Sequence, residues 1–251
     1  MGAMPSDTGR SARRRDTIVA PRPSWLPRPP RAGSLLDAFT LYPLARKLPL
    51  AFSPVRLAED LAAVPDTWWT RHLGPFHDGG WESVSLWAPR GDMHEQRSSG
   101  GTFAATKALE VTQYLSEVLE AFPGKRNRVR LMRLKAGARI LRHSDPLHTV
   151  SRDLTRIHVP VVTSPAISFL VNDRPIPLRA GEAWHIDVRF PHQVDNRSNC
   201  DRVHLVIDLI RDPALQVLLD QSTSYGHGLL LGYFVRHSLP VAVKRWLNVG
   251  N

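Results

Sequence analysis

The chain has 251 residues, of which 42% are hydrophobic, and a formal net charge of +10 at pH 7. This composition is sufficient for one well-filled domain. The single cysteine, Cys200, excludes an intramolecular disulfide framework and fits a reducing compartment. No run of about 18 apolar residues is present, and no secretory-type apolar stretch follows the N-terminal arginines. We therefore expect a soluble, cytoplasmic protein without a membrane span.

Half of the positive charge lies in residues 1–31. This segment holds seven Arg, two Asp and six of the 21 prolines, and it has neither helical nor strand periodicity. We predict a basic, disordered or extended arm, whose function could be a weak basic contact or none beyond that of a solvated tail. Residues 32–251 carry no basic stripe and no nucleic-acid-binding motif, so we expect one domain that does not bind nucleic acid.

Two helices and one strand are expected in the first half of this domain. Residues 53–64 begin with a Ser-Pro start signal and have helical apolar spacing. Residues 103–122 have a stronger helical pattern, which a Pro-Gly pair ends. Between them, WESVSLWAP (81–89) predicts a strand, and residues 90–101 predict a long polar loop that could close over a site.

The hydrophobic period changes from 3.6 to about 2 at residue 127. Short alternating segments separated by Gly, Pro, Asn and Asp continue to about residue 212. They predict a mainly β (α+β) protein with a sandwich or jelly-roll core over residues 127–212 and flanking helices. Residues 213–251 return to helical spacing, with a break or kink near Pro240, and predict a C-terminal helical segment.

Two of the predicted strands, RIHVPVV and RVHLVIDL, each have one apolar and one polar face, because strand side chains alternate. The polar faces consist of Arg156 and His158 on the first strand and of Arg202, His204 and Asp208 on the second. If the apolar faces pack on the helices, the polar faces point into the barrel and need an anionic ligand or a metal. The alternative is that they face water, as in many antiparallel sheets.

The stretch RHSDPLH contains His143 and Asp145, which are two residues apart on an extended segment and can point at one position. His192 follows in FPHQVDN, also in a strand-like context. Two histidines and one carboxylate on a β-scaffold can hold Fe(II) and leave positions open for a co-substrate and O2. An H-x-D pair also arises by chance in a chain with 11 His. Arg202, ten residues after His192, could bind a carboxylate in bidentate fashion.

About a third of the chain, through RHSD, RIHVPVV, GEAWHIDVRFPHQVDN and DRVHLVIDL, resembles the aspartyl/asparaginyl β-hydroxylase family of Fe(II)/2-oxoglutarate-dependent oxygenases, which also contains proline cis-hydroxylases. The resemblance implies a double-stranded β-helix, a cupin-like jelly roll, with His143, Asp145 and His192 as iron ligands. It also implies that Arg202 binds the distal carboxylate of 2-oxoglutarate and that His158 helps to hold its iron-chelating end.

The same resemblance implies a hydroxylase that uses Fe(II), 2-oxoglutarate and O2. Its substrate would be an amino-acid side chain, either free or within a peptide or carrier-bound intermediate. Arg156, with Arg142 nearby, would bind an anionic group of the substrate. Where some members place a serine near 2-oxoglutarate, this chain has Met132. The alternative is a cupin-like metal-binding protein without oxygenase activity. The sequence gives no indication of the oligomeric state.

Overall fold

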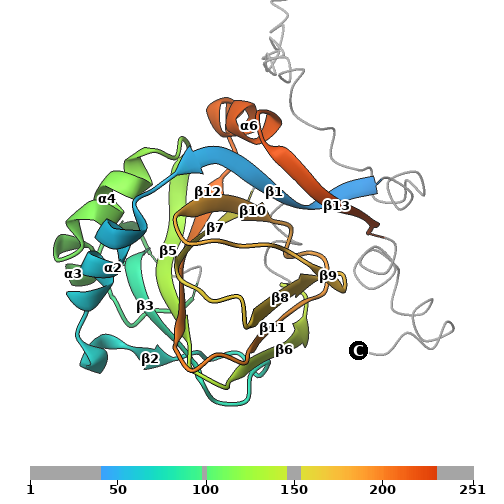
Figure 1. Cartoon of the computed structure of the whole chain (residues 1–251). Helices are drawn as coiled ribbons and strands as arrows, with labels where there is room; N and C mark the ends of the chain where they lie inside the picture. The colour runs from blue at the N-terminus through green and yellow to red at the C-terminus, as the bar shows by residue number, and fades with distance from the viewer. Residues whose placement is uncertain (1–40, 98–100, 146–153, 231–251) are drawn as a thin grey trace, which may run out of the picture.

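The computed structural model describes residues 41–97, 101–145 and 154–230. The predicted arm lies outside these residues, as does the last part of the predicted C-terminal helical segment with Pro240. Figure 1 shows the described residues as two β-sheets, with helices gathered against one side of the larger sheet. No helix among the described residues is both long and apolar enough to cross a membrane.

Thirteen strands and four α-helices make up the described part of the chain. The strands are β1 (Leu41–Ala51), β2 (Thr70–Arg71), β3 (Trp81–Pro89), β4 (Phe103–Ala105), β5 (Lys125–Leu134), β6 (Arg139–His143), β7 (Leu154–Val162), β8 (Ile167–Val171), β9 (Arg174–Pro175), β10 (Glu182–Ile186), β11 (His192–Asn196), β12 (Arg202–Ile210) and β13 (Thr223–Leu229). The helices are α2 (Pro54–Ala62), α3 (Lys107–Glu110), α4 (Gln113–Glu120) and α6 (Pro213–Asp220).

The chain alternates between the two sheets from β5 to β12. The larger sheet has the order β13-β1-β10-β7-β12-β5-β3-β2, with β4 on β3, and the smaller sheet has the order β6-β11-β8-β9. Strands β5, β7, β10 and β12 therefore belong to one sheet, and the strands between them belong to the other. All pairs are antiparallel. This winding is a double-stranded β-helix, which confirms the predicted fold class.

The β-structure extends beyond the predicted core at both ends. Strand β3 coincides with the strand predicted at 81–89, but β1 was not predicted. The predicted helical segment 213–251 begins as helix α6 and then forms strand β13. This correction has a tertiary cause, because β13 pairs along the edge of β1. Side-chain spacing within one segment carries no information about such a distant partner.

The helix predicted over residues 103–122 is also corrected: its first three residues form a strand, and the rest is divided into the two helices α3 and α4. Residues 103–105 pair with β3 as strand β4, and the Thr106 side chain then caps α3 by accepting a hydrogen bond from the N–H of Ala108. Thr112 Oγ1 donates to the Ala108 carbonyl oxygen at 2.8 Å, where α3 ends and before α4 begins. Threonine side chains compete with the helical backbone for hydrogen bonds in this way. The helix predicted at 53–64 is confirmed as α2.

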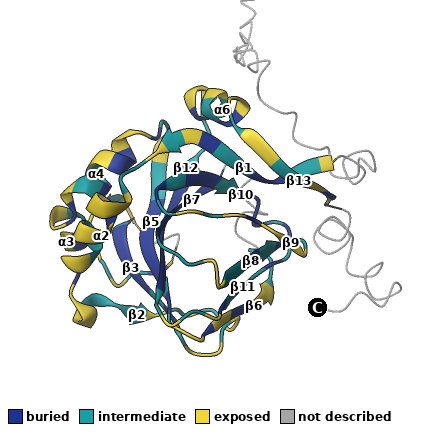
Figure 2. Cartoon of the chain, in the orientation of Figure 1, coloured by how far each residue is buried: buried dark blue, intermediate teal, exposed yellow. Residues whose placement is uncertain are grey.

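Two apolar clusters stabilise the fold. Figure 2 shows buried residues along β3, β5 and β7 of the larger sheet and exposed residues on the helices. The first lies between the helices and the larger sheet, and it contains the apolar faces of β7 and β12. The second lies between the two sheets, next to their polar residues. The apolar faces therefore pack on the helices, as predicted. The alternative that the polar face of β12 meets water is wrong, because Arg202 and Asp208 are only 3% and 1% exposed.

Candidate functional site

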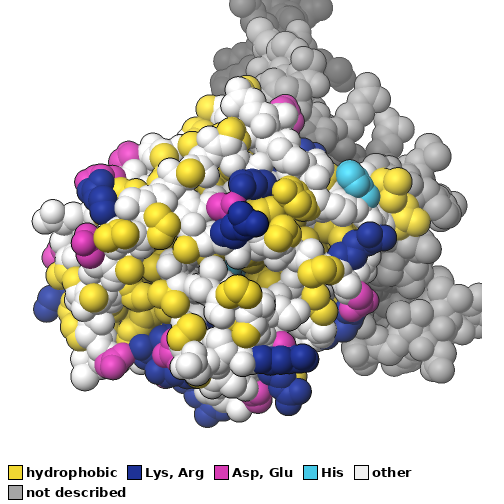
Figure 3. Space-filling view, in the orientation of Figure 1, with side chains coloured by type: hydrophobic (Ala, Val, Ile, Leu, Met, Phe, Trp, Pro, Cys, Tyr) yellow, Lys and Arg dark blue, Asp and Glu magenta, His cyan; other side chains and the backbone are white. Residues whose placement is uncertain are grey.

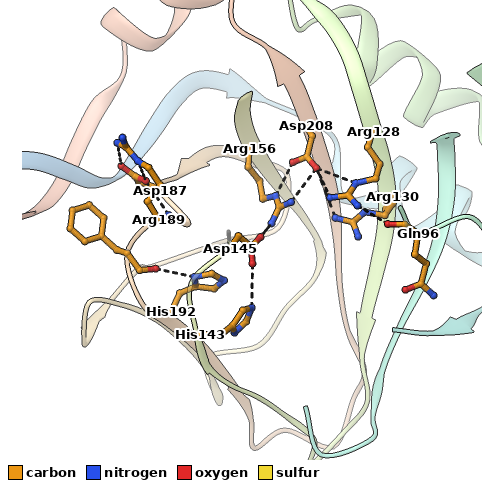
Figure 4. Close-up of polar contacts among 11 residues, drawn as sticks. Gln96, Arg128, Arg130, His143, Asp145, Arg156, Asp187, Arg189, His192 and Asp208 are labelled. Carbon is orange, nitrogen blue, oxygen red and sulfur yellow. Dashed lines mark hydrogen bonds and ion pairs between the residues drawn. The ribbon is translucent and has the colours of Figure 1, made fainter. Parts of the chain in front are cut away.

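Two histidines from the smaller sheet face one another across a pair of strands. His143 ends β6, His192 begins β11, and the two are direct cross-strand partners with ring centroids 4.3 Å apart. Asp145 follows β6, and its backbone N–H donates to the Val188 carbonyl oxygen. The donor atoms of His143, Asp145 and His192 lie within 4.8 Å of one another (Figure 4). The pairing of β6 with β11 thus brings the predicted ligands together.

The imidazole tautomers suit metal binding. His143 Nδ1 lies 2.7 Å from the Leu141 carbonyl oxygen, and His192 Nδ1 lies 3.1 Å from that of Phe190. Because a carbonyl oxygen only accepts, both Nδ1 atoms carry the proton and both Nε2 atoms keep a free lone pair. Burial lowers the pKa of His192 to about 4, so this ring is neutral near pH 7. The donor set therefore fits Fe(II), for which two His and one carboxylate are typical ligands.

Asp145 completes this set and is ionised. Burial alone would raise the pKa of its carboxyl, but the charge of the Arg156 guanidinium holds that pKa well below its usual range. Arg156 Nη1 donates to Asp145 Oδ2, and His143 Nε2 lies 3.5 Å from Asp145 Oδ1. Arg156 therefore contacts the carboxylate that was predicted to be a metal ligand.

A cavity of about 350 Å³ opens at these side chains. This volume lies within the range of small-molecule sites, roughly 300–1,000 Å³. Six residues predicted for the site line it, namely His143, Asp145, Arg156, His158, His192 and Arg202. Arg142 is not among the lining residues, because its side chain is directed to Asp173, with which it forms an exposed ion pair. The functional roles of the six lining residues and of Arg142 stay predictions.

Arg202 and His158 form one wall of the cavity. Arg202 is buried, and no carboxylate of the described residues lies within ion-pair distance of it. Burial lowers the pKa of Arg202 to about 9. His158 Nε2 is buried and has no hydrogen-bond partner in the described part of the chain. Because a buried charge without a counter-charge is costly, this wall is suited to bind an anion.

Three guanidinium groups, including that of Arg156, gather around the carboxylate of Asp208. Asp208 Oδ2 accepts hydrogen bonds from Arg128 and Arg156, each at 3.1 Å from Nη2, and Arg130 Nη2 lies 4.0 Å away (Figure 4). Arg128 Nη1 also donates to the Gln96 carbonyl oxygen at 2.6 Å. Arg130 Nε is buried without a hydrogen-bond partner among the described residues. Among the described residues, the positive charge of these three arginines exceeds the negative charge of Asp208.

Sequence reasoning missed Arg128 and Arg130 as site residues. The signal was present in RVRLMRL, where strand alternation places both on the same face as Met132, and all three line the cavity. Burial, together with the neighbouring Arg128, lowers the pKa of Arg130 well below its usual value. A buried, under-paired arginine beside a cavity is a strong indication of an anionic ligand.

Part of the predicted polar loop reaches the cavity. Gln96 and Arg97 line it, whereas residues 98–100 lie outside the described part. Gln96 accepts a hydrogen bond from the Leu73 N–H at 3.0 Å and donates to the Arg71 carbonyl oxygen at 2.8 Å. The loop is therefore joined to the segment that follows β2. Closure of this loop over the site stays a prediction.

The mouth of the cavity is apolar and aromatic. The Phe76 ring stacks on His143 with centroids 4.9 Å apart, and His72 stacks on Trp81 at 3.6 Å. Leu73 lines the same side. Figure 3 shows apolar side chains interspersed with Lys and Arg side chains on the face drawn. Several of these basic side chains lie next to Asp or Glu. The cavity thus combines charged inner walls with an apolar opening.

The family model described as aspartyl/asparaginyl β-hydroxylase matches residues 57–212. The chain belongs to this family. It is 30% identical over 161 residues to an L-proline cis-4-hydroxylase of Rhizobium meliloti (strain 1021), a match that covers 62% of this chain and 57% of the relative. It is 28% identical over 163 residues to L-proline cis-3-hydroxylase 1 of a Streptomyces species, covering 62% and 55%. The match thus spans little more than half the length of these curated relatives.

One solved structure that the chain matches is an oxidoreductase of the 2OG-Fe(II) oxygenase family from Burkholderia pseudomallei. It has a TM-score of 0.45 and 16% identity, covering 63% of this chain and 78% of that one. A prolyl-4-hydroxylase of Pseudomonas putida also has a TM-score of 0.45, with 14% identity and coverages of 68% and 94%. The family resemblance inferred from the sequence is confirmed by the family model.

Proposed function

We propose that the protein is an Fe(II)- and 2-oxoglutarate-dependent dioxygenase that hydroxylates an amino-acid side chain. The observation that carries this proposal is the set of His143, Asp145 and His192 at a cavity that is also lined by Arg202, whose guanidinium has no carboxylate partner among the described residues. A metal-binding protein without a co-substrate would not need a buried guanidinium that lacks a carboxylate partner. Family membership supports the same reaction class.

In this proposal His143, Asp145 and His192 hold the iron through two Nε2 atoms and a carboxylate oxygen. Bound iron would supply the redox chemistry by which O2 and 2-oxoglutarate convert a substrate C–H into C–OH, with succinate and CO2 as co-products. Arg202 would hold the distal carboxylate of 2-oxoglutarate in bidentate fashion, and His158 would contact its other end. The protein's own part is to fix these groups and to exclude water.

The substrate-binding end of the cavity would lie at the cluster of Arg128, Arg130 and Arg156. Among the described residues, these three arginines are paired with Asp145 and Asp208, so the described cluster has a net positive charge of one. It would bind an anionic group of the substrate, such as the carboxylate of an amino acid. The printed names of the curated relatives, both L-proline hydroxylases, support a small free amino acid. A peptide or carrier-bound residue is the alternative.

The test is an O2-free titration of 2-oxoglutarate into Fe(II)-loaded protein, followed through the weak visible charge-transfer band of a chelated keto acid. The wild type should show the band, His192→Ala should abolish it, and Arg202→Ala should weaken it. Substitution of a half-buried histidine outside the cavity, His185→Gln, is the matched control and should leave the band intact. No band despite bound iron would contradict the proposal and favour the cupin-like alternative.

The substrate is then identified by succinate formation. Iron-loaded protein is supplied with 2-oxoglutarate, O2 and a panel of free amino acids and short peptides. We expect succinate in amounts that match hydroxylated product for at least one compound with an anionic group. The proposal fails if a control oxygenase turns over under these conditions and this protein gives no succinate with any compound.

A further inference from the structure

His204 occupies a position behind the co-substrate wall. It lies on β12 two residues after Arg202, on the same face of the strand, and it is 1% exposed. Its side chain is not among those that line the cavity. His204 Nδ1 lies 2.8 Å from Arg202 Nη2. Because a guanidinium only donates, His204 Nδ1 is the acceptor and its ring proton is on Nε2.

His204 also contacts the second residue of this wall. His204 Nδ1 is 3.4 Å from His158 Nδ1, and the two rings meet edge to face with centroids 5.6 Å apart. The Phe169 ring lies parallel to that of His204, with centroids 6.5 Å apart, and the Arg202 guanidinium carbon is 5.4 Å from the Phe169 centroid. His204 and Phe169 therefore restrict the Arg202 guanidinium from two sides.

This support matters because Arg202 has few other partners. No carboxylate of the described residues pairs with it, and the cross-strand neighbour of His204 on β5 is Met132, whose thioether cannot donate a hydrogen bond. A long arginine side chain loses about 2 kcal/mol of rotamer freedom when fixed. If a hydrogen-bond acceptor fixes the guanidinium before the ligand binds, this rotamer freedom is already lost on folding. Ligand binding is then not weakened by that loss.

We propose that His204 is a positioning residue that orients the Arg202 guanidinium and thereby sets selectivity for a 2-oxo acid with a second, distal carboxylate. The proposal rests on the proposed function, in which 2-oxoglutarate binds at this wall. It predicts that His204 affects only ligands that reach Arg202. A 2-oxo acid of the same chain length that ends in a methyl group, 2-oxopentanoate, does not present a carboxylate to the guanidinium.

The experiment measures the Kd of 2-oxoglutarate and of 2-oxopentanoate for Mn(II)-loaded protein by calorimetry without O2. His204→Leu removes the acceptor, whereas His204→Asn keeps an amide oxygen close to the position of Nδ1. The Leu variant should weaken 2-oxoglutarate binding on the order of tenfold, the scale of a hydrogen bond to a charged group, and leave 2-oxopentanoate binding unchanged. The Asn variant should restore most of the 2-oxoglutarate affinity.

Each outcome has a definite meaning. Equal Kd values for 2-oxoglutarate in wild type and His204→Leu would overturn the role of His204 and leave the proposed function intact. An equal loss of affinity for both ligands would also overturn it, because a general disturbance of the wall does not discriminate between them. If the wild type itself fails to bind 2-oxoglutarate, the proposed function falls and this inference falls with it. If the Leu variant fails to fold, His204→Gln, with its amide one bond further out, should show the same selective loss.

Discussion

Replacement of Asp208 by Asn should destabilise the protein strongly while leaving side-chain shape almost unchanged. Asp208 is 1% exposed and accepts hydrogen bonds from Arg128 at 3.1 Å and from Arg156 at 2.7 Å. Asparagine keeps one oxygen acceptor but removes the charge. Among the described residues, Asp145 would then be the remaining carboxylate of this cluster, paired with Arg156, so the net charge of the described cluster would rise from one to two.

The expected loss follows from the burial of this network. Breaking a buried ion pair by neutralising one partner costs about 3–5 kcal/mol, because the remaining charge stays desolvated and uncompensated. For a chain of this size 1 kcal/mol corresponds to roughly 2–4 °C in Tm. We therefore expect Asp208→Asn to lower Tm by about 6–20 °C.

Thermal unfolding followed by circular dichroism at low ionic strength measures this loss. The matched control is Asp173→Asn, which neutralises the exposed carboxylate paired with Arg142. Exposed pairs contribute about 0–1 kcal/mol, so the control should keep a Tm close to that of the wild type. If Asp208→Asn and Asp173→Asn have the same Tm, the argument that Asp208 compensates the buried arginines is wrong.

Three further outcomes are expected. Arg130→Met should raise the KM for the substrate without changing the Kd of 2-oxoglutarate, whereas Arg142→Met should change neither, which steady-state kinetics and calorimetry test. Gly181→Ala should lower Tm much more than Gly137→Ala: both glycines have positive φ, but a Cβ at 181 would lie 2.2 Å from a backbone carbonyl oxygen and one at 137 would meet nothing within 4 Å. Burial lowers the pKa of His185 to about 3, so below pH 6.5 the unfolded chain binds a proton that the folded chain does not. Its contribution to the free energy of unfolding should fall by about 2 kcal/mol between pH 6.5 and 5, and urea denaturation of His185→Gln should show a correspondingly weaker pH dependence.

The positions of the residues nearest the proposed metal site could be predicted because their signal is local. His143 and Asp145 are two apart on an extended segment, and strand alternation alone assigns Arg202 and Asp208 to one face of β12. Alternation likewise separates the apolar face of β12 from the polar one, and the helices cover the apolar face. These inferences needed only the period of the sequence and the cost of burying charge.

The remaining features depend on pairing between distant segments. Arg142 and Arg130 are equally basic in the sequence, but β6 directs Arg142 toward Asp173 outside the cavity, whereas β5 directs Arg130 into it. Which face of a strand lies inside is decided by the partner strands and not by the strand's own composition. For the same reason the pairing of β1 with β13 could not be read from either segment.

Strand β12 connects the two proposed ends of the site. Arg202 and Asp208 are six residues apart on one face, which in an extended strand is roughly 20 Å. Between them Val206 lines the cavity, opposite His158 on β7 and Arg130 on β5. One continuous strand therefore fixes the distance between the co-substrate wall and the arginine cluster. Because β12 is paired on both sides along its length, neither end can move without breaking the ladder that holds the other. Binding of an anion at either end should consequently protect the same backbone amides of β12 from hydrogen exchange.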